Sequence, residues 1–327
     1  MADRVLDIQD LQVNFDVYGG TLKVLNGVNF HLDEGEKVGL VGETGCGKTT
    51  TAKSICKILP VPPSRISGGK ILFKGKDILE MNKKEMRQVH ATGISMIFQD
   101  PTASLNPVFT IGDQLMEAIK YSSLAEGLSR AEIREKAVHA LKEVSLPDPE
   151  RILENYPIQL SGGMRQRICI AMALATQSQL MIADEPTTSL DVTIQDQVLR
   201  LLGELVLEKD TSTILISHSL GIVREWTQRV YVMYAGSMVE TAHTKDLFAE
   251  PLHPYTKGLM DAIPKLTGKG IAQGIEGRIP NYLHPPSGCR FHPRCPKKMP
   301  VCSAENPPFF NMGDDHYVAC FLYKEQN

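Results

Sequence analysis

A glycine-rich segment near the N-terminus carries the residue types that bind phosphate. The segment GETGCGKTT follows the pattern G-x-x-x-x-G-K-[ST] between an apolar run and a helix-forming run. Its glycines let the backbone turn inward, so that N–H groups and the following helix N-terminus face phosphates. Lys48 adds a positive charge, and the hydroxyl of Thr49 is a ligand for Mg²⁺. We therefore expect a Mg-nucleoside triphosphate to contact Gly42, Glu43, Thr44, Gly45, Cys46, Gly47, Lys48, Thr49 and Thr50.

Two adjacent carboxylates end the apolar run LMIADEP further along the chain. The run is typical of a buried strand, and ligands bind at the carboxyl ends of strands in open α/β sheets. We expect Asp184 to bind Mg²⁺ through water and Glu185 to orient and deprotonate the attacking water. Alone, the acidic pair is equally consistent with capping of the next element. Together with the phosphate-binding segment, it indicates hydrolysis of the nucleotide.

The segment LSGGMRQR resembles the signature motif of ATP-binding-cassette (ABC) ATPases, and it precedes the LMIADEP run as the motif does in that family. Ser161, Gly162 and Gly163 are placed to open a helix, whose N-terminus would be a second anion-binding site. In the family, this N-terminus contacts the γ-phosphate of ATP held on the opposite subunit. Met164 stands where the family usually has glutamine, and from this we expect altered packing and retained function.

Further positions resemble the ABC pattern in order, and the resemblance covers about residues 4–245. Gln99 resembles the Q-loop glutamine, which contacts Mg²⁺ or water and begins the helical region that meets the membrane subunit. The SLD sequence at residues 189–191 resembles the D-loop, whose Asp191 would act on the ATP of the opposite subunit. His218 resembles the switch histidine that contacts the γ-phosphate, although a lone histidine after a strand is more often structural.

An aromatic residue ahead of the phosphate-binding segment is a candidate for stacking on adenine. Tyr18 lies thirty residues before Lys48 and matches the adenine-stacking aromatic of the family. Phe15 is the rival candidate. An aromatic residue in a strand is more often part of the core, which is the alternative for both.

The C-terminal segment makes the family resemblance more specific. HPYTKGLMDAIP followed by PPSGCRFHPRCPKKMPVC is similar to the extension on ATPase subunits of oligopeptide and dipeptide ABC importers. The resemblance implies two cassettes that bind two ATP head to tail, two transmembrane permease subunits and, indirectly, an extracytoplasmic peptide-binding protein. The second cassette is usually a similar ATPase in a heterodimer, and a homodimer stays open. Nickel or sugars stay open as alternative substrates.

Four of the seven cysteines lie in the last 39 residues, spaced C-x5-C-x6-C-x17-C. Four thiolates are the ligand set of a [4Fe–4S] cluster or of tetrahedral Zn²⁺. Structural zinc sites usually contain C-x2–4-C knuckles, which this spacing lacks, so the pattern favours a structural iron–sulfur cluster. Free thiols or two disulfides are the alternative, although a reducing cytosol disfavours disulfides. The expected ligands are Cys289, Cys295, Cys302 and Cys320.

Basic residues interleave with these cysteines, namely Arg290, Arg294, Lys297 and Lys298. Their charges could offset the negative charge of a cluster. A solvated basic rim is the equally consistent interpretation, because a run of charges is usually solvated.

A helical insert is predicted between about residues 110 and 145. In RAEIREKAVHALKEVSL, the apolar residues Ile133, Ala137, Leu141 and Val144 recur at helical spacing. We therefore expect these four side chains to share the buried face of one helix.

The pattern of elements predicts the fold that positions these motifs. Strand-like runs fill the first forty residues, and LMIAD and STILIS, separated by a helical stretch, indicate a parallel buried sheet. Together with the resemblance to ABC ATPases, this implies an α/β fold of the P-loop NTPase (RecA-like) type, an ABC nucleotide-binding domain with an N-terminal β-subdomain and a helical subdomain at about 100–165. The cassette is expected at 1–245, and a small, loop-rich, metal-binding extension at 246–327, where proline and glycine become frequent.

Composition limits the remaining function classes. With 327 residues, 42% hydrophobic and 22% charged, the chain is an ordinary globular protein with room for a core domain and an appendage. The net charge of −3 gives no overall attraction to nucleic acid, and none is expected as a partner. No apolar run approaches the roughly 20 residues that cross a bilayer. We expect a peripheral subunit at the cytoplasmic face of the membrane.

Two other classes of ABC protein are disfavoured. A DNA-repair ATPase would carry a long inserted coiled coil and a translation ATPase would carry two cassettes, whereas this sequence has one cassette and no heptad run. A regulatory module with a degenerate ATPase would lack catalytic positions, but Lys48, Glu185 and His218 are all present.

Overall fold

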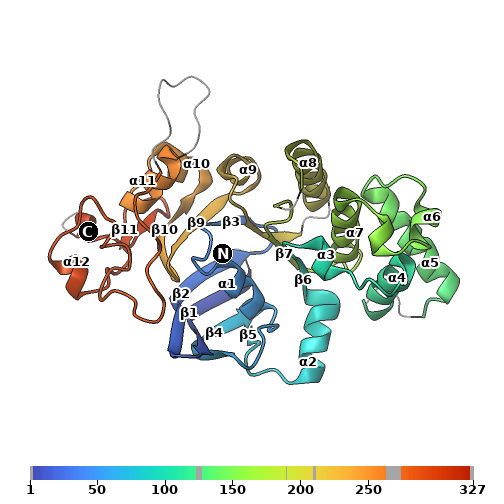
Figure 1. The fold of residues 1–327 in the computed structure, drawn as a ribbon, viewed down its shortest axis with the longest axis horizontal. Coiled ribbons are helices and arrows are strands. Elements are labelled where there is room, and N and C mark those ends of the chain that lie inside the picture. Colours follow the sequence, from blue (N-terminus) through green and yellow to red (C-terminus); the bar gives the residue numbers. More distant parts are fainter. Residues whose placement is uncertain (1–2, 123–126, 189, 209–210, 263–273, 325–327) are drawn as a thin grey trace. The chain divides into compact units, whose positions relative to one another are not determined.

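The chain forms two compact units, Met1–Leu79 with Leu215–Asn327 and Glu80–Ile214. The computed structural model describes residues 3–122, 127–188, 190–208, 211–262 and 274–324. Figure 1 traces the chain from its N-terminal strands to its C-terminal loops. The expected domain boundary between residues 245 and 246 falls inside a helix of the first unit, α10 (Thr244–Ala249), and stays a prediction.

The N-terminal strands of the first unit form an antiparallel sheet in the order β2-β1-β4-β5 (Figure 1). Side chains such as Leu6 and Ile8 alternate inward along β1, as expected for a strand with one buried face. A register shift around Asp10, which has a φ of 48°, lets the alternation resume at Leu11. The strands are β1 (Arg4–Val17), β2 (Gly20–Asp33), β4 (Ser64–Phe73) and β5 (Lys76–Asp77).

A second set of strands in the first unit joins the glycine-rich segment to the C-terminal extension. The fully buried β3 (Lys37–Val41) pairs in parallel with β9 (Arg229–Tyr234), and β9 pairs antiparallel with β10 (Ser237–His243). β10 also pairs with β12 (Tyr317–Val318), which pairs with β11 (Phe310–Asn311). The extension therefore completes the sheet that contains β3. The helices of this unit are α1 (Lys48–Ile55), α9 (Leu220–Trp226), α10, α11 (Pro254–Asp261), α12 (Val301–Ala304) and η4 (Phe321–Tyr323).

The second unit places a helical region beside two parallel strands, β6 (Ile94–Ile97) and β7 (Leu180–Asp184). The predicted helical face is confirmed for Ile133, Ala137 and Leu141, which are buried within α5, whereas Val144 is buried but follows the last residue of that helix. β8 (Ser212–Ile216) carries the chain back to the first unit. The other elements are α2 (Lys83–Gln88), η1 (Val89–Gly93), α3 (Pro101–Ser104), α4 (Ile111–Tyr121), α5 (Arg130–Glu143), α6 (Pro149–Leu153), η3 (Pro157–Gln159), α7 (Gly162–Leu174) and α8 (Val192–Glu208).

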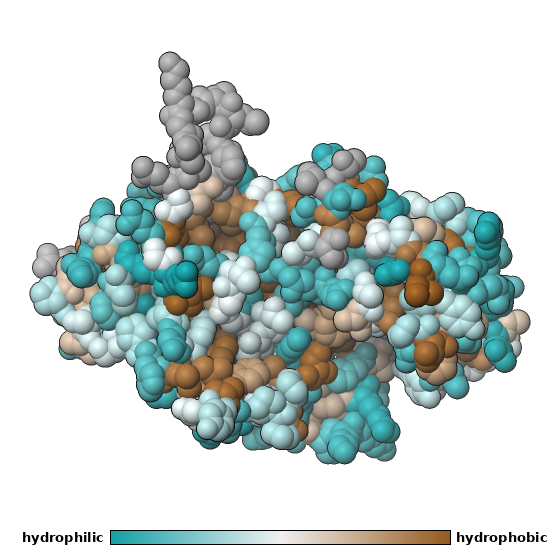
Figure 2. Space-filling model, viewed as in Figure 1, coloured by the Kyte–Doolittle hydropathy of each residue, from teal (hydrophilic) through white to brown (hydrophobic). Residues whose placement is uncertain are grey.

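Hydrophilic residues cover much of the face in Figure 2, between separate hydrophobic patches. In the part of the chain that the structure describes, no helix is both long enough and apolar enough to cross a membrane.

The turn between β9 and β10 is held against two other segments of the first unit. The N–H of Gly236 donates to the carbonyl oxygen of Cys46 at 2.7 Å, and its own carbonyl accepts from the N–H of Asn26 at 2.8 Å. Gly236 has a φ of +80°, and a Cβ there would lie 1.8 Å from the carbonyl oxygen of Val24. Only glycine fits this turn.

We therefore predict that Gly236→Ala lowers the thermal unfolding midpoint by several degrees, because a methyl group would overlap backbone and the left-handed conformation costs about 1–2 kcal/mol. Gly75→Ala is the matched control, since Gly75 has a φ of +77° and a Cβ there meets no atom within 4 Å. Calorimetry of the two variants should show a clearly larger loss for Gly236→Ala. Equal losses would contradict the tight packing of the turn.

Candidate nucleotide-binding site

The segment between β3 and α1 has the inward-turned backbone expected of a phosphate-binding loop. Gly42, Gly45 and Gly47 have φ values of 151°, 83° and 112°. A Cβ on Gly42 would lie 2.1 Å from the carbonyl oxygen of Met233, and one on Gly47 would lie 2.7 Å from Cδ2 of Leu25. Both the backbone conformation and the close packing therefore require glycine at these positions.

Positive charge and a helix N-terminus meet at this loop. Nζ of Lys48 donates to the carbonyl oxygens of Gly42 at 2.8 Å and Glu43 at 3.1 Å, and the lysine is buried. α1 begins at Lys48, so the positive end of its helix dipole lies at the same place, beside the half-buried Thr49. This arrangement is suited to the phosphates of a nucleotide.

The predicted switch histidine lies at the phosphate-binding loop. His218 follows β8, and its Nε2 is 3.5 Å from Oγ1 of Thr44. The two residues are 174 positions apart in the sequence. The fold of the first unit thus brings together two residues that were each predicted to contact the nucleotide.

The predicted carboxylates of the second unit lie at the end of β7. Asp184 is its last residue, and both Asp184 and Glu185 are buried. Nε2 of Gln99 donates to Oε2 of Glu185 at 2.8 Å, and Oγ1 of Thr188 donates to the same oxygen at 3.2 Å. Glu185 has a φ of 48°, a backbone conformation that residues other than glycine rarely adopt. Such conformations are concentrated at functional sites. The carboxylate of Glu185 is therefore held in one direction.

The predicted helix start at Ser161 is present in the second unit. Ser161 is the N-cap of α7, and its Oγ accepts the N–H of Met164 at 3.3 Å. Ser161 and Gly162 are exposed. A Cβ on Gly163 would lie 2.8 Å from Cγ2 of Ile194, so the helix start packs closely on the first turns of α8.

The D-loop positions lie just before α8. Asp191 is exposed, and its carbonyl oxygen accepts the N–H of Gln195 at 2.8 Å. The N–H of Leu190 donates to the carbonyl oxygen of Thr187 at 3.0 Å. Ser189 lies outside the described residues.

The adenine-stacking candidate is a surface residue. Tyr18 lies fully exposed in the turn between β1 and β2, whereas Phe15 is half-buried within β1. The alternative that Tyr18 belongs to the core is therefore wrong. An exposed ring suits stacking on a base.

The four C-terminal cysteines are free thiols, and three of them lie at one apolar cluster. Cys302 and Cys320 are buried in it, Cys289 packs against it, and the N–H of Cys289 donates to the carbonyl oxygen of Cys302 at 2.9 Å. Burial, with repulsion from the other three thiolates, raises the pKa of Cys320 to about 11. Within the described ranges, no group of three or more His, Cys, Asp or Glu side chains is arranged to hold a metal ion. These side chains therefore do not form a completed cluster or zinc site.

Two basic residues between these cysteines are not a solvated rim, and that expectation is wrong for them. Arg290 is buried and donates to two backbone carbonyl oxygens of the first unit. The side chain of Arg294 is only 5% exposed and forms a bidentate ion pair with Glu43 of the phosphate-binding loop. Lys297 and Lys298 are exposed, as a solvated rim requires.

The phosphate-binding loop is contacted by three residues of the extension, and the sequence did not predict these contacts. The N–H of Glu43 donates to the hydroxyl of Tyr255 at 2.8 Å, and the hydroxyl of Tyr282 donates to the carbonyl oxygen of Gly45 at 2.7 Å. Arg294 is the third. One feature of the sequence could have indicated such a contact. Glu43 is a carboxylate inside a loop expected to bind anions, and its negative charge favours a cationic partner from another segment.

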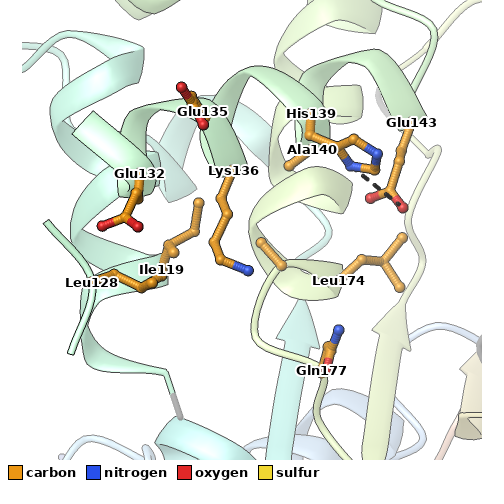
Figure 3. A pocket seen from close by; sticks show the side chains of 11 residues that line it. Ile119, Leu128, Glu132, Glu135, Lys136, His139, Ala140, Glu143, Leu174 and Gln177 are labelled. Carbon is orange, nitrogen blue, oxygen red and sulfur yellow. Dashed lines mark ion pairs between the residues drawn. The ribbon is translucent and has the colours of Figure 1, made fainter. Parts of the chain in front are cut away.

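A separate hollow of about 580 Å³ lies in the helical region of the second unit (Figure 3). α4, α5 and α7 supply most of its lining, which includes Ile119, Lys136 and Leu174. Nδ1 of His139 lies 4.0 Å from Oε1 of Glu143 at its edge, the pair joined by the dashed line in Figure 3. None of the predicted nucleotide-site residues lines it.

Solved structures of ABC proteins resemble the structure of this chain. An ATP-binding cassette, MJ0796, solved as a dimer bound to ADP and phosphate, matches with a TM-score of 0.65 at 24% identity, covering 73% of this chain and 98% of that one. CbiO1 from Clostridium perfringens, part of an ABC transporter complex, matches with a TM-score of 0.61 at 28% identity, covering 76% of this chain and 92% of that one. The fold is thus that of an ABC nucleotide-binding domain.

Comparison of the sequence with known proteins identifies the family as well as the fold. Residues 25–188 match the family described as ABC transporter, and residues 239–302 match the one described as oligopeptide/dipeptide transporter, C-terminal region. The chain is 46% identical to the dipeptide transport ATP-binding protein DppD of Bacillus subtilis, covering 99% of this chain and 96% of that protein. It is 43% identical to the oligopeptide transport ATP-binding protein OppD of Salmonella typhimurium, with the same shares covered. The chain therefore belongs to the family of ATP-binding subunits of dipeptide and oligopeptide ABC transporters and is an ABC-type ATPase.

Proposed function

We propose that this chain couples ATP binding and hydrolysis to the uptake of dipeptides or oligopeptides across a membrane. The substrate class rests on the relatives named for dipeptide and oligopeptide transport and on the matching C-terminal region. The single observation that carries the motor role is the glycine-defined loop at the start of α1, which has the form of a phosphate-binding site.

In this proposal, the loop of residues 42–50 binds the ATP phosphates, and Tyr18 stacks on the adenine. Its exposed ring supports that role. Mg²⁺ is held by the hydroxyl of Thr49, by Gln99 and, through water, by Asp184. Hydroxyl, amide and carboxylate oxygens are the ligands that Mg²⁺ prefers.

Glu185 is the proposed base that orients and deprotonates the attacking water. The hydrogen bonds from Gln99 and Thr188 support this assignment, because both fix the carboxylate at the end of a buried strand. His218 is proposed to contact the γ-phosphate, and its approach to Thr44 supports a place at the phosphate-binding loop.

Ser161, Gly162, Gly163 and Asp191 are proposed to act on ATP held by a second ABC ATPase subunit. The capped and exposed N-terminus of α7 supports this role, since a helix N-terminus attracts an anion. Each chain then carries half of each of two ATP sites in a head-to-tail dimer. The chain alone is expected to be a poor ATPase.

Glu185→Gln is predicted to permit ATP-driven dimerisation and to lower the turnover number by about 10²–10⁴-fold, because the amide cannot accept the proton of the attacking water. Turnover is measured by phosphate release, and dimerisation by size-exclusion chromatography with Mg-ATP. Glu204→Gln, on the exposed face of α8, is the matched control and should keep the wild-type rate. Hydrolysis by Glu185→Gln near the wild-type rate would rule out the base assignment.

Two transmembrane permease subunits are the proposed partners on the membrane side, with the chain held peripherally at the cytoplasmic face. An extracytoplasmic peptide-binding protein is the indirect partner. Three large apolar side chains of the second unit, Val108, Phe109 and Ile158, are between 51% and 80% exposed, and the first two follow Gln99 in the sequence. Arg165 donates to the carbonyl oxygen of Pro157 at 2.7 Å and so fixes one part of this surface. Exposed apolar groups of this kind are typical of a protein interface.

Phe109→Asp with Ile158→Asp is predicted to abolish recovery of the two permeases in a pull-down, because two carboxylates would have to be desolvated in the contact. ATP binding should be unchanged. Leu207→Asp, at another exposed apolar position of the same unit, is the control and should recover both permeases. Recovery of ribosomes or DNA by the wild-type chain would contradict the transporter role.

A [4Fe–4S] cluster on Cys289, Cys295, Cys302 and Cys320 is also part of the proposal, with Zn²⁺ as the alternative. Their spacing supports a shared metal centre, and so does the position of Cys289, Cys302 and Cys320 at one apolar cluster. Among the residues that the structure describes, these side chains are not arranged as a completed site, so binding would require them to rearrange. Such a centre would stabilise the loop-rich extension.

Protein purified without oxygen is predicted to be brown and to contain about four iron atoms per chain, as a [4Fe–4S] centre requires. Iron content and the visible spectrum are the measurements, and Cys302→Ser should lower both. A colourless preparation with about one zinc per chain would reverse the choice of metal. A preparation free of both metals would leave the four residues as thiols.

A further inference from the structure

Glu43 places a carboxylate inside a loop that has to attract phosphates. It is the second residue of the GETGCGKTT segment, and its carbonyl oxygen also accepts from Nζ of Lys48 at 3.1 Å. An uncompensated carboxylate here would repel the phosphates of ATP and compete with them for Lys48. The loop therefore needs a positive charge directed at Glu43.

Arg294 of the C-terminal extension supplies that charge. Its Nη1 lies 2.7 Å from Oε2 of Glu43, and its Nη2 lies 3.1 Å from Oε1. Such a bidentate ion pair fixes the orientation of the carboxylate and compensates its negative charge. The two residues are 251 positions apart and lie in the same unit.

Every N–H group of the Arg294 guanidinium has a hydrogen-bond acceptor in this position. Its Nε donates to the carbonyl oxygen of Glu276 at 2.8 Å, and Nη2 also donates to that of Ile275 at 3.0 Å. Nη1 also donates to the hydroxyl of Tyr234 at 3.4 Å. With the two bonds to Glu43, all five N–H groups have acceptors. An arginine held by so many partners is a fixed element of the site.

Two tyrosines hold the backbone of the same loop. The hydroxyl of Tyr255 accepts the N–H of Glu43, and the hydroxyl of Tyr282 donates to the carbonyl oxygen of Gly45. Burial raises the pKa of both hydroxyls, so both stay protonated. Tyr255 packs against Phe291 with ring centroids 5.4 Å apart, which keeps its hydroxyl at the loop.

We propose that Arg294 is a positioning residue of the ATP site, which neutralises Glu43 and holds the phosphate-binding loop in shape, so that the C-terminal extension completes the ATP site of its own subunit. This inference rests on the proposed assignment of residues 42–50 to the ATP phosphates. Tyr255 and Tyr282 assist by fixing the backbone on either side of Thr44.

The test measures the Kd of a fluorescent ATP analogue with Mg²⁺ for the full-length chain. Arg294→Ala should weaken binding by about 10- to 100-fold, because Glu43 is left as an unpaired carboxylate beside the phosphates. Adding Glu43→Gln to Arg294→Ala should restore most of the affinity, since the repelling charge is then gone. Arg278→Ala, an exposed arginine of the same extension, should bind as the wild type does.

The outcomes separate this inference from the assignment of the loop. Lys48→Ala should lose binding, and normal binding by that variant would contradict the loop assignment itself. If Lys48→Ala fails to bind and Arg294→Ala binds normally, the role of Arg294 is overturned. Weak binding by Arg294→Ala that Glu43→Gln does not restore would also overturn it. If Arg294→Ala does not fold, Arg294→Lys replaces it and should show a smaller loss that Glu43→Gln again reverses.

Discussion

A phosphate-binding loop has to keep its N–H groups turned inward before any anion is present to hold them. Three glycines with positive φ make this backbone accessible, but glycine also gives the loop other conformations of similar energy. The first unit limits that freedom with bonds from outside the loop. Gly236 donates to the carbonyl oxygen of Cys46, while Tyr255 and Tyr282 hold two further positions. The shape of the site therefore depends on a strand turn and on the C-terminal extension.

The extension is itself anchored by a buried carboxylate on β10. Glu240 is completely buried and accepts the N–H groups of Leu252 at 2.7 Å and His253 at 2.8 Å. His316, just before β12, approaches it at 2.7 Å through Nε2. A buried charge is stable only when its partners are in place, so Glu240 links both ends of the extension to β10. The same extension brings Arg294 and Tyr282 to the loop, and its folding and the order of the ATP site are physically connected.

The parts of the site that depend on local chemistry could be predicted from the sequence. The glycines of the loop and the N-cap at Ser161 follow from requirements of a turn and a helix start, which a short motif encodes. The contact between Arg294 and Glu43 could not be predicted, because no local pattern records which distant segments pack together. Charged residues are usually solvated, and that expectation failed for Arg290. Cysteine spacing suggested a metal centre but could not supply the orientation of the four thiols.

The central claim is that residues 42–50 bind the ATP phosphates in a loop that the C-terminal extension holds. An experimental structure of the chain with Mg²⁺ and a non-hydrolysable ATP analogue tests it most directly. The account predicts the phosphates against this loop and the start of α1, with Lys48 turned from the carbonyl oxygens of Gly42 and Glu43 toward the phosphates and Arg294 still paired with Glu43. Phosphates bound elsewhere, or an ion pair broken by the nucleotide, would contradict it.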